Sequence, residues 1–445
     1  MKPSIPRRYI YVAVLLLSTL WVWMFLGRPF RIPSHVSWEM YSDTVGSSMF
    51  DAYAKADLYD NEPLHSAAIH SICAEKEWNP GLVFTCDWSV GGVGNVRNSM
   101  LSCLRYAIEA GGAMVMPRII VRSADNIADI RTDERADIGY MFDRQHFTES
   151  LRISCPELHL YDTIHDIPNV ESANEPIKLL PESIVEGHIP ATGLEHPELW
   201  RETFYNWLSN HTMTSFGAPT IVELMRSYLQ YPIYDDGNDF ALNFGRILKF
   251  REDVRVLAAI TVHELAVQFS LSINESESVS RNAFFGAHLR TEMDAVKGWP
   301  PQDWKYSRYD TQSQLYLEQA SRSNASVIYV ASGNVTEVAR FADDARATGD
   351  FLVTTKFDLL KKQHLKMLNK LAWDQQGMVD FLVMLRATDF AGIAHSSFAW
   401  NIALRRHIRS NISNYLDGPQ MLSDELSQIY GQPRGYPEYY SCMWP

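Results

Sequence analysis

Short apolar segments alternate with helix-like segments in two separate stretches of the chain, and this alternation restricts the fold more than any other feature. The first stretch reads as one β-α-β unit: an apolar run, a glycine-rich turn, a helix to about Ala110, and a second apolar run at 113–117. The second stretch contains four apolar runs, NAFFGAHLR, SVIYVASG, DFLVTTK and FAGIAHSSF. Strands that alternate with helices form parallel sheets. We therefore predict an α/β fold with two doubly wound domains facing each other.

The length of 445 residues accommodates two domains of about 200 residues each. We predict an N-terminal domain at 81–278 and a second domain at 279–412. A stem with peripheral helices is expected at 27–80, and a C-terminal tail at 413–445.

Between the two alternating stretches the pattern is mixed. Residues 165–200 are rich in proline and glutamate, which predicts an irregular surface excursion. Helical patterns are visible at 199–209, 220–230 and 250–268.

The N-terminal segment 9–26 is apolar and carries no charge. As a helix it would be roughly 27 Å long, enough to span a bilayer core. Lys2, Arg7 and Arg8 precede it, so residues 1–8 are expected to be cytoplasmic. We predict a transmembrane signal anchor in the bilayer of the Golgi or endoplasmic reticulum, and thus a type II protein; a cleaved signal peptide is the alternative.

Glycosylation triplets and cysteines agree with a lumenal location for the residues after the anchor, and the net charge bears on the kind of partner. The net charge of −13 and the pI near 5.5 argue against a nucleic-acid partner. Asn-x-Ser/Thr triplets begin at Asn210, Asn274, Asn324, Asn334 and Asn411. Five cysteines without metal-ligand spacing suggest one or two disulfides in an oxidising compartment, with the pairing open: Cys73, Cys86, Cys103, Cys155 and Cys442.

The glycine-rich turn GGVGN (91–95) has three readings. Gly92 and Gly94 lack the third glycine of a dinucleotide fingerprint, so that signal is weak. A tight β-to-α turn explains the glycines equally well. In the third reading, Gly94 lets a ligand sugar approach the backbone while Asn95 hydrogen-bonds it.

His288, Arg290 and Asp294 follow the apolar run at 282–287. Ligands of open α/β folds lie at the carboxyl ends of strands, and a guanidinium suits two oxygens of a diphosphate. The structural alternative is a salt bridge from Arg290 to Glu292 or Asp294, with His288 as a half-buried histidine.

A second polar group follows the last apolar run, where Ser396, Ser397 and Phe398 lead into a helix. Hydroxyls and helix N-terminal amides can surround a phosphate, and a serine here can equally serve as an N-cap. The chain contains no Asp-x-Asp pair, the usual metal-diphosphate ligand of sugar transferases. Side-chain cations and backbone amides would then neutralise a diphosphate.

Taken together, these motifs resemble the GDP-fucose protein O-fucosyltransferase family. HLR-x-x-x-D (288–294) and DFAGIAHSSFAWNIALRR (389–406) carry most of the resemblance. Residues 87–118 resemble the family's first β-α-β unit, MFDRQHFTESL (141–151) its Phe-Asp-x-x-His-Phe segment, and LVTTKFDLL (352–360) its lysine-containing turn. The motifs follow the family's order across roughly residues 80–410.

The resemblance implies a GT-B architecture, with two Rossmann-like domains around a donor cleft and inverting, metal-independent transfer of fucose from GDP-fucose. Arg290 is then the diphosphate cation and Asn95 lies next to the fucose, and both are implied to be catalytic. His288, Asp294, Ser396, Ser397 and Phe398 are implied to contact the nucleotide and phosphates, with Gly92 and Gly94 in the donor loop.

The acceptor and the catalytic base stay open. Some relatives carry a glutamate in the glycine-rich loop that acts as base, and WSVGGVGN has none. An Asn-assisted dissociative route is one solution, with Asp294 or Asp87 as weaker base candidates. A protein Ser/Thr acceptor is favoured; the alternatives are a glycan acceptor and an inactive GT-B scaffold in the lumen.

Overall fold

The computed structural model describes residues 62–123, 126–185, 193–211, 217–226, 231–274, 277–298, 304–410, 423–431 and 443–445. All of these residues belong to one compact unit. The expected anchor at 9–26 lies outside the described residues. Within the described ranges, no helix combines the length and the hydropathy needed to cross a bilayer.

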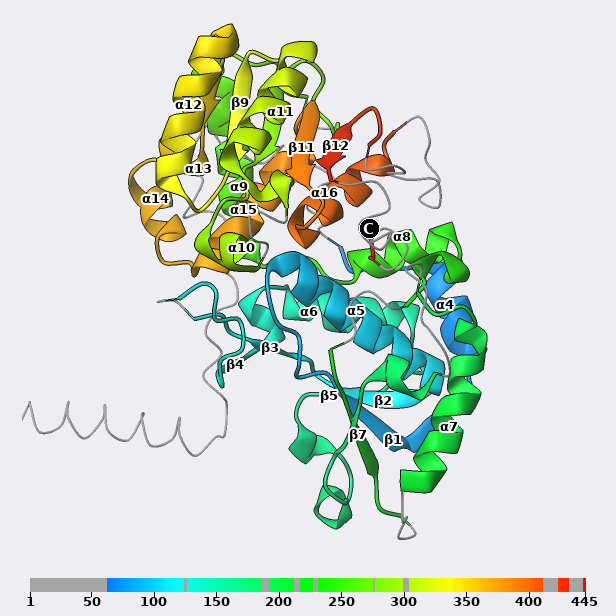
Figure 1. The fold of residues 1–445 in the computed structure, drawn as a ribbon. Helices are drawn as coiled ribbons and strands as arrows, with labels where there is room; N and C mark the ends of the chain where they lie inside the picture. The colour runs from blue at the N-terminus through cyan, green and yellow to red at the C-terminus, as the bar shows by residue number, and fades with distance from the viewer. Residues whose placement is uncertain are drawn as a thin grey trace, which may run out of the picture. The chain divides into compact units, whose positions relative to one another are not determined.

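The first sheet has five parallel strands in the order β5-β2-β1-β7-β6 (Figure 1). β1 (Asn79–Thr85) lies between β2 (Gly112–Val115) and β7 (Thr220–Leu224). The outer strands are β5 (Leu160–Tyr161) and β6 (Ile177–Leu179). β3 (Arg118–Ile120) and β4 (Arg135–Asp137) form a separate antiparallel pair. The β-α-β unit predicted at the start of this region is confirmed.

The helix predicted at 220–230 is wrong, because Thr220–Leu224 is strand β7. Its β-branched residues Thr220, Ile221 and Val222 favour a strand, and β7 pairs with β1 on one side and β6 on the other. Hydrogen bonding to a strand on each side outweighs the helical spacing of apolar residues in this segment. The excursion at 165–200 likewise contributes edge strand β6.

The second sheet also has five parallel strands, in the order β10-β9-β8-β11-β12. The strands are β8 (Phe284–His288), β9 (Val327–Ala331), β10 (Leu352–Thr354), β11 (Asp389–Ile393) and β12 (Ser427–Tyr430). In chain order this is 3-2-1-4-5, the strand order of a Rossmann-type sheet. The first four strands match the predicted apolar runs, whereas β12 lies in the segment predicted as a C-terminal tail.

Helices cover the second sheet on both faces. On one face, α11 (Tyr309–Arg322) and α12 (Val335–Gly349) pack on alternate strand residues such as Phe285, Ile328 and Ile393. On the other face lie α9 (Glu252–Phe269), α15 (Trp373–Leu385) and α16 (Ser397–His407). This period-two alternation turns His288, two residues after Gly286, toward α16.

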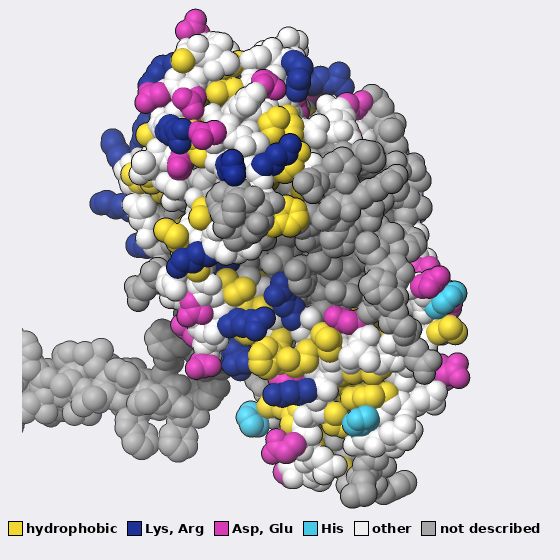
Figure 2. Space-filling model, in the orientation of Figure 1, with side chains coloured by type: hydrophobic (Ala, Val, Ile, Leu, Met, Phe, Trp, Pro, Cys, Tyr) yellow, Lys and Arg dark blue, Asp and Glu magenta, His cyan; other side chains and the backbone are white. Residues whose placement is uncertain are grey.

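The remaining helices are shorter or peripheral. They are α4 (Ala67–Ala74), α6 (Arg144–Ser154), α7 (Trp200–His211), α8 (Asn238–Arg246), α10 (Met293–Gly298), α13 (Lys356–Leu359) and α14 (Lys362–Leu368). On the face shown in Figure 2, acidic and basic side chains are interspersed over the region of the second sheet.

Helix α5 (Val93–Ala110) lies between the first sheet and the helices of the second, and 17 of its 18 residues are buried. Its fully buried Arg97 donates to Gly245 O at 2.6 Å, Asn401 Oδ1 at 3.0 Å and Trp444 O at 2.5 Å. Arg97 therefore links α5 to α8, α16 and the C-terminal residues.

Two disulfides join the cysteines whose pairing the sequence left open. Cys86 at the end of β1 is bonded to Cys103 of α5. Cys73 of α4 is bonded to Cys155 after α6. The first bond attaches α5 to the strand that precedes it.

Candidate active site

A cavity of about 690 Å³ is lined by segments that follow strands of both sheets. Its second-sheet walls include the residues after β8 and β11, which are adjacent strands with connections running in opposite directions. Crevices at such switch points are the usual ligand sites of open α/β sheets. The volume lies within the usual range for small-molecule sites.

The N-terminus of α5 forms one wall. Gly92, its N-cap, lines the cavity, and a Cβ placed there would meet no atom within 4 Å. Asn95 also lines the cavity and is the one residue of α5 that is not buried. Gly94 does not line it: a Cβ there would lie 2.7 Å from the backbone carbonyl of Ser397, so Gly94 permits the contact between α5 and α16.

His288 is the last residue of β8 and lies against the ring of Phe398, with 4.6 Å between the ring centroids. It is 6% exposed, and burial lowers the pKa of its imidazole to about 3, so the ring is neutral near pH 7. Its buried Nδ1 has no hydrogen-bond partner among the described residues. Both rings line the cavity.

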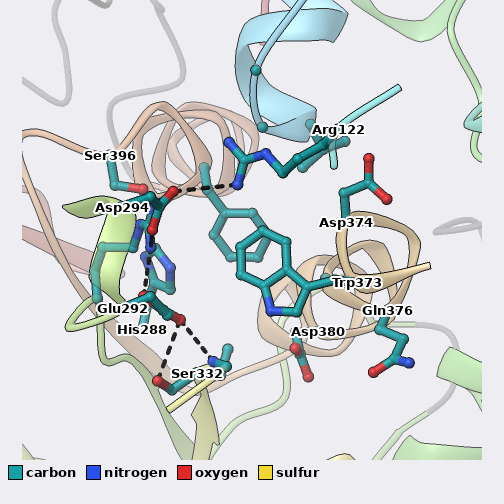
Figure 3. Close-up of a pocket in the computed structure, with 18 of the residues that line it drawn as sticks. Arg122, His288, Glu292, Asp294, Ser332, Trp373, Asp374, Gln376, Asp380 and Ser396 are labelled. Carbon is teal, nitrogen blue, oxygen red and sulfur yellow. Dashed lines mark hydrogen bonds and ion pairs between the residues drawn. The ribbon is translucent and has the colours of Figure 1, made fainter. Parts of the chain in front are cut away.

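Arg290 lines the cavity and is ion-paired with two carboxylates that also line it, Glu292 and Asp294. Figure 3 shows these two carboxylates on the same side of the cavity as His288. The guanidinium of Arg290 bonds Glu292 Oε2 at 2.5 Å and Asp294 Oδ1 and Oδ2 at 2.9 and 2.7 Å. Arg122 reaches Asp294 from the first half of the fold at 3.2 Å. The salt bridges considered as the structural alternative are thus present, and they hold the guanidinium in one orientation at the cavity.

The start of α16 completes this side of the cavity. Ser396 is the N-cap and Ser397 and Phe398 begin the helix, and all three line the cavity. No side-chain cap bond from Ser396 is formed, so its hydroxyl does not serve the capping role considered from the sequence. Eight of the nine residues predicted from the sequence therefore line one cavity, Gly94 being the exception.

Several lining residues were not predicted. Arg122 follows the apolar strand β3 as Arg290 follows β8, a signal that was available in the sequence. Its guanidinium lies 5.1 Å from the ring centroid of Trp373 at the start of α15. The other unpredicted charged residues that line the cavity are Glu292, Lys297, Lys356, Asp374 and Asp380.

Comparison with known proteins gives one family match. The model of the GDP-fucose protein O-fucosyltransferase family matches residues 82–409. Among solved structures, POFUT1 in complex with GDP-fucose is similar at 12% identity and a TM-score of 0.46, over 80% of this chain and all of that chain. A mutant of Arabidopsis thaliana FUT1 in complex with GDP is similar at 11% identity and a TM-score of 0.38, over 81% of this chain and 76% of that chain. No curated protein sequence matches significantly.

Proposed function

We propose that this chain, which belongs to the GDP-fucose protein O-fucosyltransferase family, transfers fucose from GDP-fucose to a hydroxyl acceptor, with protein serine or threonine favoured. The reaction is inverting and needs no metal, and the two parallel sheets are the halves of a GT-B fold. One observation carries the proposal: the family-like motifs at 92–95, 288–294 and 396–398 line the same cavity.

The cavity offers partners for each part of the donor. The N-terminus of α16, with Ser396 and Ser397, provides hydroxyls and backbone amides for the diphosphate, and Arg290 adds a cation. His288 and Phe398 present apolar ring surface and an unpartnered Nδ1 for the nucleoside. Gly92 leaves room for the fucose, and the side-chain amide of Asn95 can hydrogen-bond it.

Metal-independence is supported by how the carboxylates of the cavity are used. Glu292 and Asp294 are ion-paired with Arg290, and Asp380 is ion-paired with Lys356. A carboxylate whose charge is already balanced by arginine or lysine attracts a divalent cation less strongly, which leaves Asp374 as the one cavity carboxylate without an ion pair among the described residues. The diphosphate is therefore neutralised by side-chain cations and helix N-termini.

The proposed role of Arg290 follows from the negative charge that develops on the β-phosphate during transfer. As the C1–O bond between fucose and the β-phosphate breaks, the electron pair moves to the phosphate and the sugar becomes oxocarbenium-like. A guanidinium already oriented by Glu292 and Asp294 strengthens its bonds to the leaving oxygen at that moment. Removing such a donor typically costs about 10²–10³ in rate.

We place the catalytic part in the lumen of the Golgi or endoplasmic reticulum, with residues 9–26 as the bilayer anchor. The two disulfides support an oxidising compartment.

Calorimetric titration of the full-length chain with GDP-fucose and GDP-mannose, with chelator present, tests the donor. We expect binding that prefers GDP-fucose and weakens at least about tenfold in Arg290→Lys, because an ammonium lacks the planar fork. Arg144→Lys is the matched control, since Arg144 also pairs with two carboxylates, Asp137 and Asp162, but does not line the cavity. Absence of GDP-fucose binding, or equal effects of both variants, would overturn the donor site. Binding without turnover would indicate a scaffold.

A further inference from the structure

Four carboxylates line the cavity, and three of them are in ion pairs. Glu292 bonds Arg290, and it also accepts from Gly333 N at 2.7 Å. Asp294 is shared by Arg290 and Arg122. The charges of these two carboxylates are therefore balanced by arginine side chains.

Asp380, the third of these carboxylates, is ion-paired with Lys356 and accepts from the Tyr329 hydroxyl at 2.7 Å. Both of its oxygens are therefore occupied. It is not available to take a proton.

Asp374 differs from these three. It is the first-turn acidic residue of α15, and no ion pair involves it among the described residues. Its Oδ1 accepts from the Tyr140 hydroxyl and from Gln375 N, each at 2.9 Å. Figure 3 shows it with Trp373 and Gln376, on the other side of the cavity from His288 and Glu292. Its second oxygen, Oδ2, accepts no hydrogen bond from the described residues, and Asp374 lines the cavity.

The base candidates named from the sequence fit less well. Asp87 follows β1 and does not line the cavity. The bonds and charge of Arg290 hold the pKa of Asp294 below its usual value, although burial opposes this shift. A carboxylate in that state is a poor proton acceptor.

The geometry points to Asp374 as the residue that takes the proton from the acceptor hydroxyl, an assignment that rests on the proposed function. The acceptor oxygen bonds to C1 of fucose while the C1–O bond to the β-phosphate breaks. The electron pair of that bond leaves with GDP, and the acceptor's proton moves to Asp374 Oδ2. Atoms and charge balance without a further reactant.

The surroundings of Asp374 suit this role. Burial raises the pKa of its carboxyl, while the Tyr140 hydrogen bond and the charge of Arg122 act in the opposite direction. The groups that act on it are the Tyr140 hydroxyl, the backbone amides of Gln375 and of Asp374 itself, and the charge of Arg122. A carboxylate with a raised pKa is a stronger base than the same group in water.

Asp374→Asn tests the assignment, because the amide oxygen can still accept from Tyr140 while the proton acceptor is lost. GDP release is measured in the full-length chain with GDP-fucose and either water or azide as acceptor. Water must lose a proton and azide need not. We expect turnover with water to fall about 10²–10⁴-fold, turnover with azide to stay near that of the parent, and the Kd for GDP-fucose to stay unchanged.

Two further variants separate proton transfer from structure. Asp389→Asn is the matched control, because Asp389 is also a carboxylate with a pKa raised by burial but does not line the cavity; it should leave both rates unchanged. Tyr140→Phe removes a bond that favours the charged carboxylate, so the acidic limb of the pH–rate profile should move to higher pH.

Equal losses with water and azide, or an unchanged rate with water, would overturn the assignment of Asp374 while leaving the proposed function standing. A parent chain that binds no GDP-fucose, or releases no GDP with either acceptor, would overturn both.

Discussion

The absent side chain of Gly94 is what allows α5 to lie against the backbone of Ser397. A Cβ on Gly94 would come within 2.7 Å of the carbonyl carbon and oxygen of Ser397. These atoms are backbone in the first turn of α16, so they cannot rotate away as a side chain would.

Gly94→Ala is therefore expected to lower the free energy of unfolding by about 1–3 kcal/mol and to displace the start of α16. Gly92→Ala is the control, because Gly92 has an extended φ of −73° and open space around its Cα. It should change stability by less than about 0.5 kcal/mol. Urea unfolding measures both; similar losses in the two variants would contradict this account.

His288 makes stability depend on pH. Burial lowers its pKa to about 3 in the folded chain, against 6.5 in the unfolded chain. The unfolded state binds more protons below pH 6.5, so stability is lost as the pH falls from 6.5 toward 3. At pH 5 the loss from His288 alone should be about 2 kcal/mol.

Urea unfolding between pH 7 and 5 measures this loss. His288→Gln should flatten the profile, whereas His70→Gln, at an exposed position of α4, should not. If the free energy of unfolding of His288→Gln fell between pH 7 and 5 as steeply as that of the parent, His288 would not be the source of the pH dependence.

Lys356 and Asp380 form a buried ion pair, with side chains 6% and 5% exposed. Lys356→Met leaves the Asp380 charge buried without a partner and should cost about 3–5 kcal/mol. Lys356→Met combined with Asp380→Asn should recover most of the loss, because the amide can still accept from Tyr329. Chemical unfolding of the single and double variants decides this; a double variant as unstable as Lys356→Met would contradict it.

The two disulfides are expected to contribute unequally. Cys86 and Cys103 are 17 residues apart, and Cys73 and Cys155 are 82 apart. Loop-closure entropy predicts losses of about 3 and about 4.5 kcal/mol when each pair is replaced by alanine. Unfolding under non-reducing conditions should give this order; the reverse order would show that the Cys86–Cys103 bond acts mainly on the native packing of α5.

Much of this arrangement follows from local pattern. Apolar runs buried on both faces identified four strands of the second sheet, and the predicted residues after β8 and β11 supplied six residues of the cavity wall. The resemblance to the family grouped His288 with Phe398, and the adjacency of β8 and β11 is what brings the two rings into contact.

The features that the sequence did not predict depend on long-range contacts. Strand β7 is set by its neighbours β1 and β6 rather than by its own spacing. Arg122 and Asp294 are 172 residues apart, and Tyr140 and Asp374 are 234 apart. The local pattern of apolar and polar residues does not show which half of the chain supplies the partner of a buried carboxylate.

The acceptors of Arg97 also bear on how such a protein can be recombined. Rossmann-like halves are often treated as interchangeable modules, yet this buried guanidinium of the first half bonds Asn401 of the second and Trp444 near the C-terminus. In a chimera that takes either half from a relative, the guanidinium of Arg97 would be buried without these partners unless the chimera also carried both acceptors. Arg97 therefore makes the packing of the first half depend on residues of the second.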